Sequence, residues 1–176
     1  MNIPDEDKDI LYSGYSYLFL LNKKSPSFFT DMRLNAIFTS FVCSRKWAWN
    51  VIGISNNAYL EFKNLEFKKR PKVRRGHLVQ RIDTFRLLFD KVSTSNRQEP
   101  YPKSEFWEIF LPNDKTVLMT AEENGRKFIP DYYKISNDDY QLFTSDGIGF
   151  IFGKKEKEFL KNFDVEAAEL ISGNYP

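Results

Sequence analysis

The chain has 176 residues, of which 41% are hydrophobic and 16% aromatic, enough to bury a core and too many for a disordered chain. Its 26 Lys and Arg against 24 Asp and Glu leave a formal charge of +2, so net charge indicates no class of partner. One cysteine and one histidine exclude an intrachain disulfide and zinc sites of the Cys/His type. The acidic N-terminus is unlike a signal or transit peptide, and no uncharged apolar run could span a membrane. We therefore expect a cytoplasmic protein with no membrane partner.

In the first part of the chain, the acidic residues 1–10 are expected to form a flexible tail. The aromatic-rich segment 12–24 is interpreted as a strand, and residues 25–34 could continue as its hairpin partner. Residues 35–43, "NAIFTSFVC", fit either a buried strand or a short helix. Ser55 is a candidate N-cap for a helix over the residues that follow it.

The middle of the chain contains a predicted helix and an ambiguous segment. In residues 77–92 the apolar side chains recur at helical spacing, which predicts a helix. Residues 106–120, "FWEIFLPNDKTVLMT", are typical of a hairpin that turns at Pro-Asn-Asp-Lys. A helix over 105–111 is an equally good interpretation of its first half.

The last part predicts a second hairpin and a closing helix. Residues 139–153 are interpreted as a hairpin that turns at Asp146-Gly147, and residues 155–172 as an amphipathic helix. Strands mixed with helices, without regular alternation, predict an α+β fold with a mixed or antiparallel sheet and flanking helices. We expect a single domain over residues 1–176.

The densest basic run of the chain ends near its only histidine. Seven Lys or Arg and no carboxylate lie between Lys68 and Arg81, and this stretch includes "RRGH", residues 74–77. Neutral imidazole suits a general base near neutral pH, and an adjacent Arg can clamp a phosphate oxygen. The same pattern is also typical of a solvated basic surface.

The stretch "RRGHLVQRID" resembles the signature Asp-Arg-Gly-His-Leu-Val-x-Arg-x-Asp of the non-specific DNA/RNA endonucleases, the ββα-metal nucleases that include endonuclease G. Further fragments follow in the order that the family shows, among them "TSNRQEP", "KSEFWEIF" and "FIPDYYKIS". The resemblance implies a ββα-metal core in which His77 is the general base and Arg75 contacts the phosphate. It also implies that Asn96 holds Mg²⁺ and that Glu105 takes part in catalysis.

The function implied by this resemblance is a Mg²⁺-dependent endonuclease that cleaves DNA, RNA or both with little sequence preference. The residues expected to bind nucleic acid are Lys68, Lys69, Arg70, Lys72, Arg74 and Arg81. An unrestrained nuclease would damage its own cell, so an inhibitor or regulatory protein is an expected partner.

Departures from the family pattern leave an alternative open. Arg74 stands where the signature has Asp, and the Thr-Gly-Pro element of the family is replaced by Met119-Thr120-Ala121. The alternative is an inactive relative or an interaction module that binds nucleic acid or an acidic protein through residues 68–81. In a third interpretation, His77 is the incidental first residue of a core helix. A pairing of His77 with Asn96 would favour the nuclease, because a pure binder has no use for that pair.

Overall fold

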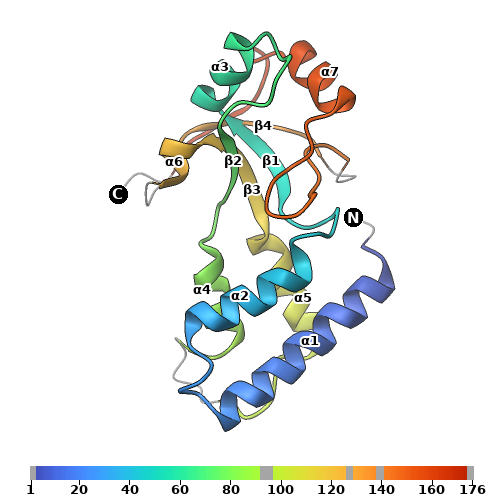
Figure 1. Ribbon diagram of the computed structural model, residues 1–176, viewed down its shortest axis with the longest axis vertical. Helices are drawn as coiled ribbons and strands as arrows, with labels where there is room; N and C mark the ends of the chain where they lie inside the picture. The colour runs from blue at the N-terminus through green and yellow to red at the C-terminus, as the bar shows by residue number, and fades with distance from the viewer. Residues whose placement is uncertain (1–2, 92–96, 126–128, 138–140, 174–176) are drawn as a thin grey trace.

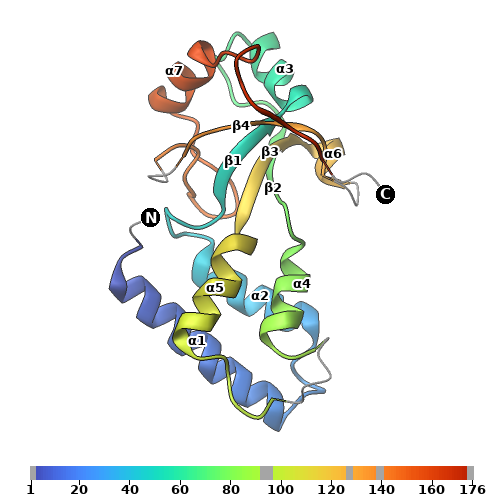
Figure 2. The same ribbon diagram turned by 180° about the vertical axis from the view of Figure 1, so that it is seen from behind.

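The computed structural model describes residues 3–91, 97–125, 129–137 and 141–173, and these form the predicted α+β fold with a mixed sheet and flanking helices (Figure 1). The helices α1, α2, α4 and α5 gather at one end of the molecule, and the sheet with α3, α6 and α7 forms the other end (Figure 2). In chain order the described elements are α1 (Asp5–Lys24), α2 (Asp31–Val42), β1 (Asn50–Ser55), α3 (Asn56–Asn64), β2 (Val73–His77), α4 (Arg81–Leu88), α5 (Lys103–Asn113), β3 (Lys115–Thr120), α6 (Ala121–Gly125), β4 (Tyr132–Lys134), α7 (Lys154–Asn162) and β5 (Leu170–Ile171).

Helix α1 corrects the strand prediction for residues 12–24. Its buried side chains, Leu11, Tyr15, Leu18, Phe19 and Asn22, recur three or four residues apart and form one face of a helix. The aromatic content favoured a strand, but the helical period of the buried positions decides the structure. The flexible-tail prediction was also wrong for residues 5–10, which form the first turns of this helix.

Helix α2 follows a short turn, so the predicted hairpin partner over residues 25–34 was wrong. The helix begins after Thr30, whose side chain accepts a hydrogen bond from the Arg33 N–H at 3.4 Å. For residues 35–43 the helical interpretation is confirmed, because residues 35–42 belong to α2 and Cys43 directly follows it. Phe38, from the middle of α2, is fully buried against rings of α4 and α5.

The sheet has the strand order β2-β3-β1-β4-β5. Strands β1 and β3 are parallel, and the other neighbouring pairs are antiparallel. Residues 106–120 are therefore not a hairpin, because α5 ends at Asn113 and β3 then pairs with β1 and β2. Residues 141–153 contain no strand, which corrects the second hairpin in the part that the structure describes; a turn does occur there, with Gly147 at φ 125°.

The chain has two main hydrophobic cores among its described residues. The first is the aromatic core among α1, α2, α4 and α5. The second lies between the sheet and helices α3 and α7. Phe62 of α3 and Leu160 of α7 pack with strand residues that include Leu118. The predicted cap of α3 is confirmed, since Ser55 Oγ accepts a hydrogen bond from the Ala58 N–H at 3.1 Å. The closing helix is shorter than the predicted 155–172, because α7 ends at Asn162 and Leu170 begins strand β5.

Two features of the fold bear directly on the sequence hypotheses. The helix predicted over residues 77–92 begins at Arg81, and His77 is the last residue of β2 and not the start of a core helix. Strand β2 pairs with β3, but α4 and α5 lie between them in the chain, and a ββα-metal core is not confirmed by this arrangement. Among the residues that the structure describes, no helix has both the length and the apolar composition needed to cross a membrane.

Candidate anion-binding site at His77

Strand β2 presents Arg75 and His77 on the same face of the sheet, because side chains in a strand alternate between the two faces. Both are withdrawn from solvent: Arg75 is 7% exposed, and the side chain of His77 is 15% exposed. Gly76 lies between them, and a Cβ built there would come within 2.4 Å of Met119 Sδ and 2.8 Å of Asn124 Oδ1. Glycine at this position therefore lets β3 and α6 pack closely against β2.

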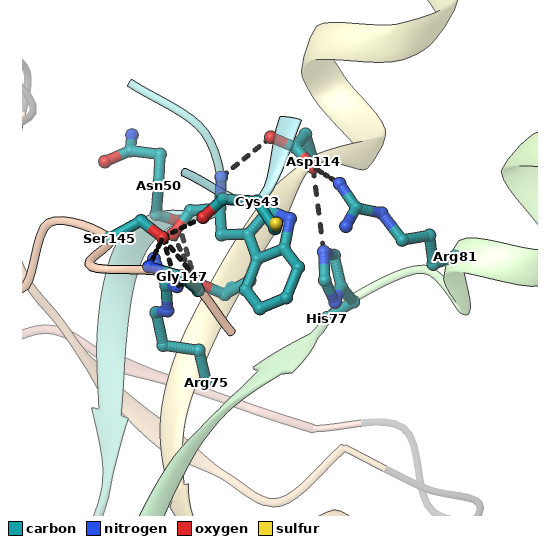
Figure 3. Close-up of polar contacts among 10 residues, drawn as sticks. Cys43, Asn50, Arg75, His77, Arg81, Asp114, Ser145 and Gly147 are labelled. Carbon is teal, nitrogen blue, oxygen red and sulfur yellow. Dashed lines mark hydrogen bonds and ion pairs between the residues drawn. The ribbon is translucent and has the colours of Figure 1, made fainter. Parts of the chain in front are cut away.

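The carboxylate of Asp114 joins the elements around His77 (Figure 3). Asp114 directly follows α5 and is buried. Its Oδ1 accepts a hydrogen bond from Arg81 Nη2 at 2.8 Å, and its Oδ2 accepts one from the Trp49 N–H at 2.7 Å. His77 Nε2 lies 3.6 Å from Asp114 Oδ1, which is longer than a normal hydrogen bond but close enough for the charge to orient the ring. Three segments that are distant in the chain thus meet at this carboxylate: that of Trp49, that of His77 and Arg81, and that of Asp114 itself.

Trp49 packs among the charged groups of the site. The guanidinium carbons of Arg75 and Arg81 lie 4.6 Å and 4.7 Å from its ring, and the His77 ring meets it edge-on at 5.3 Å. Trp49 has φ 57°, in the left-handed region that bulky side chains rarely adopt. Its N–H is bound by Asp114 and its carbonyl accepts from Thr116 Oγ1 at 2.8 Å, so the backbone is held in this conformation from both sides. Strain of this kind is concentrated at functional sites.

Arg75 is a buried cation held by backbone carbonyls. Its Nη2 contacts the Ser145 hydroxyl and the Gly147 carbonyl (Figure 3). It also contacts the Gly149 carbonyl. Burial lowers the pKa of Arg75 to about 10, and the negative charge of Asp114 opposes that change. The guanidinium thus stays charged at neutral pH. Among the described residues, no carboxylate lies within ion-pairing distance of it.

His77 is held as a neutral imidazole at pH 7. Burial lowers its pKa below the usual 6.5, the nearby positive charges of Arg81 and Arg75 act in the same direction, and Asp114 opposes them. Asp114 favours a proton on Nε2, the nitrogen nearest to it, which leaves a lone pair on Nδ1. A neutral ring with a free lone pair can accept a proton or a hydrogen bond.

These groups surround a pocket of about 690 Å³. Such a volume lies in the range of small-molecule sites. Several buried N–H donors around it have no acceptor among the described residues; they are Trp49 Nε1, Arg75 Nε, Arg75 Nη1 and Arg81 Nη1. Leaving a buried donor unpaired costs about 1–3 kcal/mol, and more where the group is charged. The lining of the pocket therefore has more buried donors than acceptors.

The predicted site residues other than Glu105 fall into three groups. The pocket is lined by His77, Arg75, Arg70, Arg74 and Arg81. Three of the predicted cations do not line it and are exposed on the surface, namely Lys68, Lys69 and Lys72. Asn96 lies outside the described residues, so its pairing with His77 stays a prediction.

Glu105 is not brought to the pocket. It lies exposed in the first turn of α5. The neighbouring Phe106 and Phe110 turn the buried face of this helix toward the aromatic core of the helical end. Glu105 is therefore exposed on the helical end of the molecule and does not line the pocket.

The described residues at the pocket do not fit a hydrated magnesium ion. Among those that line it, the single carboxylate is that of Glu123, whose oxygens accept hydrogen bonds from Ser55, Asn57 and the Thr120 N–H. Both oxygens of the adjacent Asp114 are also occupied. No group of three His, Cys, Asp or Glu that could hold a metal occurs in the described part of the chain. Magnesium binding stays a prediction that rests on the family resemblance.

Sequence analysis did not identify two residues of this site, Trp49 and Asp114. Trp49 precedes a strand, and Asp114 lay in the supposed hairpin turn, where Asp is common for local reasons. No local pattern connects either residue to His77, because the proximity arises only when β1, β2 and β3 align. Comparison with family models, with curated proteins and with solved structures finds no match to this chain.

Proposed function

We propose that this protein binds the phosphate backbone of a nucleic acid at the His77 pocket. The observation that carries the proposal is the burial of Arg75 and Arg81 beside one cavity, with N–H donors that have no acceptor among the described residues. Two guanidinium groups offer planar sets of donors, which match the oxygens of a phosphate. Asp114 balances only one of the two charges, so the pocket keeps a net positive charge for an anion.

A polyanion fits the surroundings of the pocket better than a small dianion. Arg70 and Arg74 extend the positive lining toward the surface, and Lys69 and Lys72 lie exposed in the same segment. A chain of phosphates could place one group in the pocket and others along this segment. Phosphate contacts of this kind make affinity depend strongly on salt.

The second candidate is cleavage of the bound phosphodiester, with His77 as the general base. The neutral His77 ring and its orientation by Asp114 favour this candidate, because a base must be unprotonated to accept a proton from the attacking hydroxyl or water. Arg75, two residues away on the same strand face, could stabilise negative charge that develops on the phosphate.

The test compares two charge-removing variants of one basic segment, Arg75→Gln in the pocket and Lys69→Gln outside it. Binding of fluorescent single-stranded DNA and RNA is followed by anisotropy over a range of salt concentrations. We expect Arg75→Gln to weaken binding by at least about tenfold, because hydrogen bonds to charged groups contribute roughly 1.5–3 kcal/mol. Lys69→Gln should weaken oligonucleotide binding much less. Equal losses of affinity in the two variants would show that the segment is an ordinary basic surface.

The same oligonucleotides separate binding from cleavage when the products are analysed with Mg²⁺ and with a chelator. If the second candidate is correct, His77→Ala should lower the cleavage rate by at least about 100-fold while leaving oligonucleotide binding nearly unchanged. Binding without products under either condition would leave phosphate binding as the function and reject cleavage.

A further inference from the structure

The pocket at His77 continues around the edge of the sheet onto its second face. Strand β2 is an edge strand, and its residues alternate, so that Arg74 and Gly76 point away from the face that carries Arg75 and His77. In the register of β2 and β3, Arg74 lies opposite Met119. The pocket is nevertheless lined from both faces of β2.

The part of the pocket on the second face has a different chemical character. Its lining is apolar over Leu78, Met119 and Ile129, which belong to the small core cluster on this side of the sheet. Two polar side chains, Arg74 and Asn124, border these apolar groups. Neither has a hydrogen-bond or ion-pair partner among the described residues.

Gly76 keeps the two parts of the pocket close together. Because Met119 Sδ and Asn124 Oδ1 lie within 3 Å of where a Cβ of residue 76 would stand, any larger residue would push them from the strand. The amide of Asn124 is therefore held beside the β2 backbone at Gly76, next to Arg75 in the strand.

We infer that the second part of the pocket is a subsite for a nucleobase, whose nucleotide places its phosphate against Arg75 and Arg81. This inference rests on the proposed function and names the unit of nucleic acid that the pocket takes. A nucleotide has an anionic end and a planar base joined by a sugar, and it can pass around a single edge strand.

Each group of the subsite matches one part of a base. The apolar side chains Leu78, Met119 and Ile129 can cover the faces of the ring, and the guanidinium of Arg74 can stack on it. An Asn amide has one acceptor and two donor positions for the hydrogen-bonding edge of a base. Backbone groups of β2 that point away from β3 have no strand partner in the described part of the chain and can add further hydrogen bonds.

The test uses three kinds of ligand that share a phosphate: inorganic phosphate, ribose 5-phosphate and the four nucleoside 5′-monophosphates. Their dissociation constants for the full chain are measured by ¹H–¹⁵N NMR titration, which also reports the Asn124 side-chain amide. Stacking contributes about 1–3 kcal/mol per base, so at least one nucleotide should bind about fivefold or more tightly than ribose 5-phosphate. The Asn124 amide signal should shift with that nucleotide and not with the sugar phosphate.

Two variants test whether the gain in nucleotide affinity depends on Asn124. Asn124→Ala should lower the affinity for the preferred nucleotide toward that of ribose 5-phosphate and leave ribose 5-phosphate binding unchanged. Asn162→Ala, which removes an exposed amide at the end of α7, should change neither.

The possible failures are distinguishable. Equal affinities for nucleotides and ribose 5-phosphate, with a stationary Asn124 signal, would overturn the base subsite and leave the phosphate site standing. If neither these ligands nor the oligonucleotides shift the signals of Arg75 and His77, the proposed function fails and the subsite fails with it.

Discussion

The aromatic core of the helical end and the site at His77 are both buried, but they differ in the chemistry of the groups that they bury. In the helical core, the hydroxyl of Tyr15 donates to the Leu88 carbonyl at 3.0 Å and accepts from the Tyr101 N–H at 3.0 Å. Around His77, charged N–H groups of Arg75 and Arg81 have no acceptor among the described residues. The first region buries mostly aromatic rings, whereas the second buries two guanidinium groups and a carboxylate, whose transfer out of water costs free energy.

This difference predicts that the helical core carries the larger share of stability. Phe38 is fully buried and meets the rings of Phe85 and Phe110 at 5.0 Å and 5.8 Å. Phe38→Ala should lower the free energy of unfolding by about 3–5 kcal/mol, because it removes apolar contacts and leaves a cavity. Urea unfolding followed by tryptophan fluorescence measures this.

The matched control for Phe38 is Phe28→Ala, since Phe28 is 57% exposed and should cost far less. An equal loss of unfolding free energy in Phe28→Ala and Phe38→Ala would contradict the predicted importance of the helical core.

A smaller but substantial loss of unfolding free energy is expected when a charged group of the His77 site is removed. Asp114 is the buried carboxylate that pairs with Arg81, so Asp114→Asn removes one member of a buried ion pair and should cost about 3 kcal/mol. Removing this charge should also lower the pKa of His77 further, because Asp114 opposes the effect of burial. Thermal unfolding and an NMR titration of the His77 ring measure the two effects.

Asp83→Asn serves as the control for Asp114, because Asp83 is largely exposed and contacts Arg86 on the surface of α4. Asp83→Asn should have little effect on the thermal stability or on the pKa of His77. If the pKa of His77 rose in Asp114→Asn, the assigned influence of Asp114 would be incorrect.

The smallest effect is a pH dependence that belongs to the site and not to the helical core. Burial lowers the pKa of folded His77 below 6.5, so between the folded and unfolded values only the unfolded chain binds this proton. The contribution of neutral His77 is therefore complete above about pH 6.5 and is lost as the pH falls below it. Within this window the slope is at most about 1.4 kcal/mol per pH unit.

The measurement compares the wild type with His77→Gln by urea unfolding from pH 8 to pH 5. The difference between their unfolding free energies should be constant above pH 7 and should shift against the wild type below pH 6.5. A constant difference over the whole range would mean that His77 titrates alike in the folded and unfolded chains.

Sequence by itself determined the features that depend on near neighbours. Ser55 caps α3 because its hydroxyl meets an N–H three residues on, and this contact needs nothing from the rest of the chain. Arg75 and His77 share a strand face because they are two residues apart, although strand β2 itself was not predicted from the sequence. The α+β class followed from the mixture of local patterns, although aromatic content was mistaken for a strand signal in α1.

Tertiary structure alone decided the composition of the site. Asp114 comes to His77 because β3 starts beside the end of β2, and Trp49 comes to both because it precedes β1, the parallel neighbour of β3. Likewise, Glu105 faces away because Phe106 and Phe110 bury the opposite side of α5. Contacts between distant segments depend on strand pairing and on which helix face finds a core, and no local pattern in this chain specifies either.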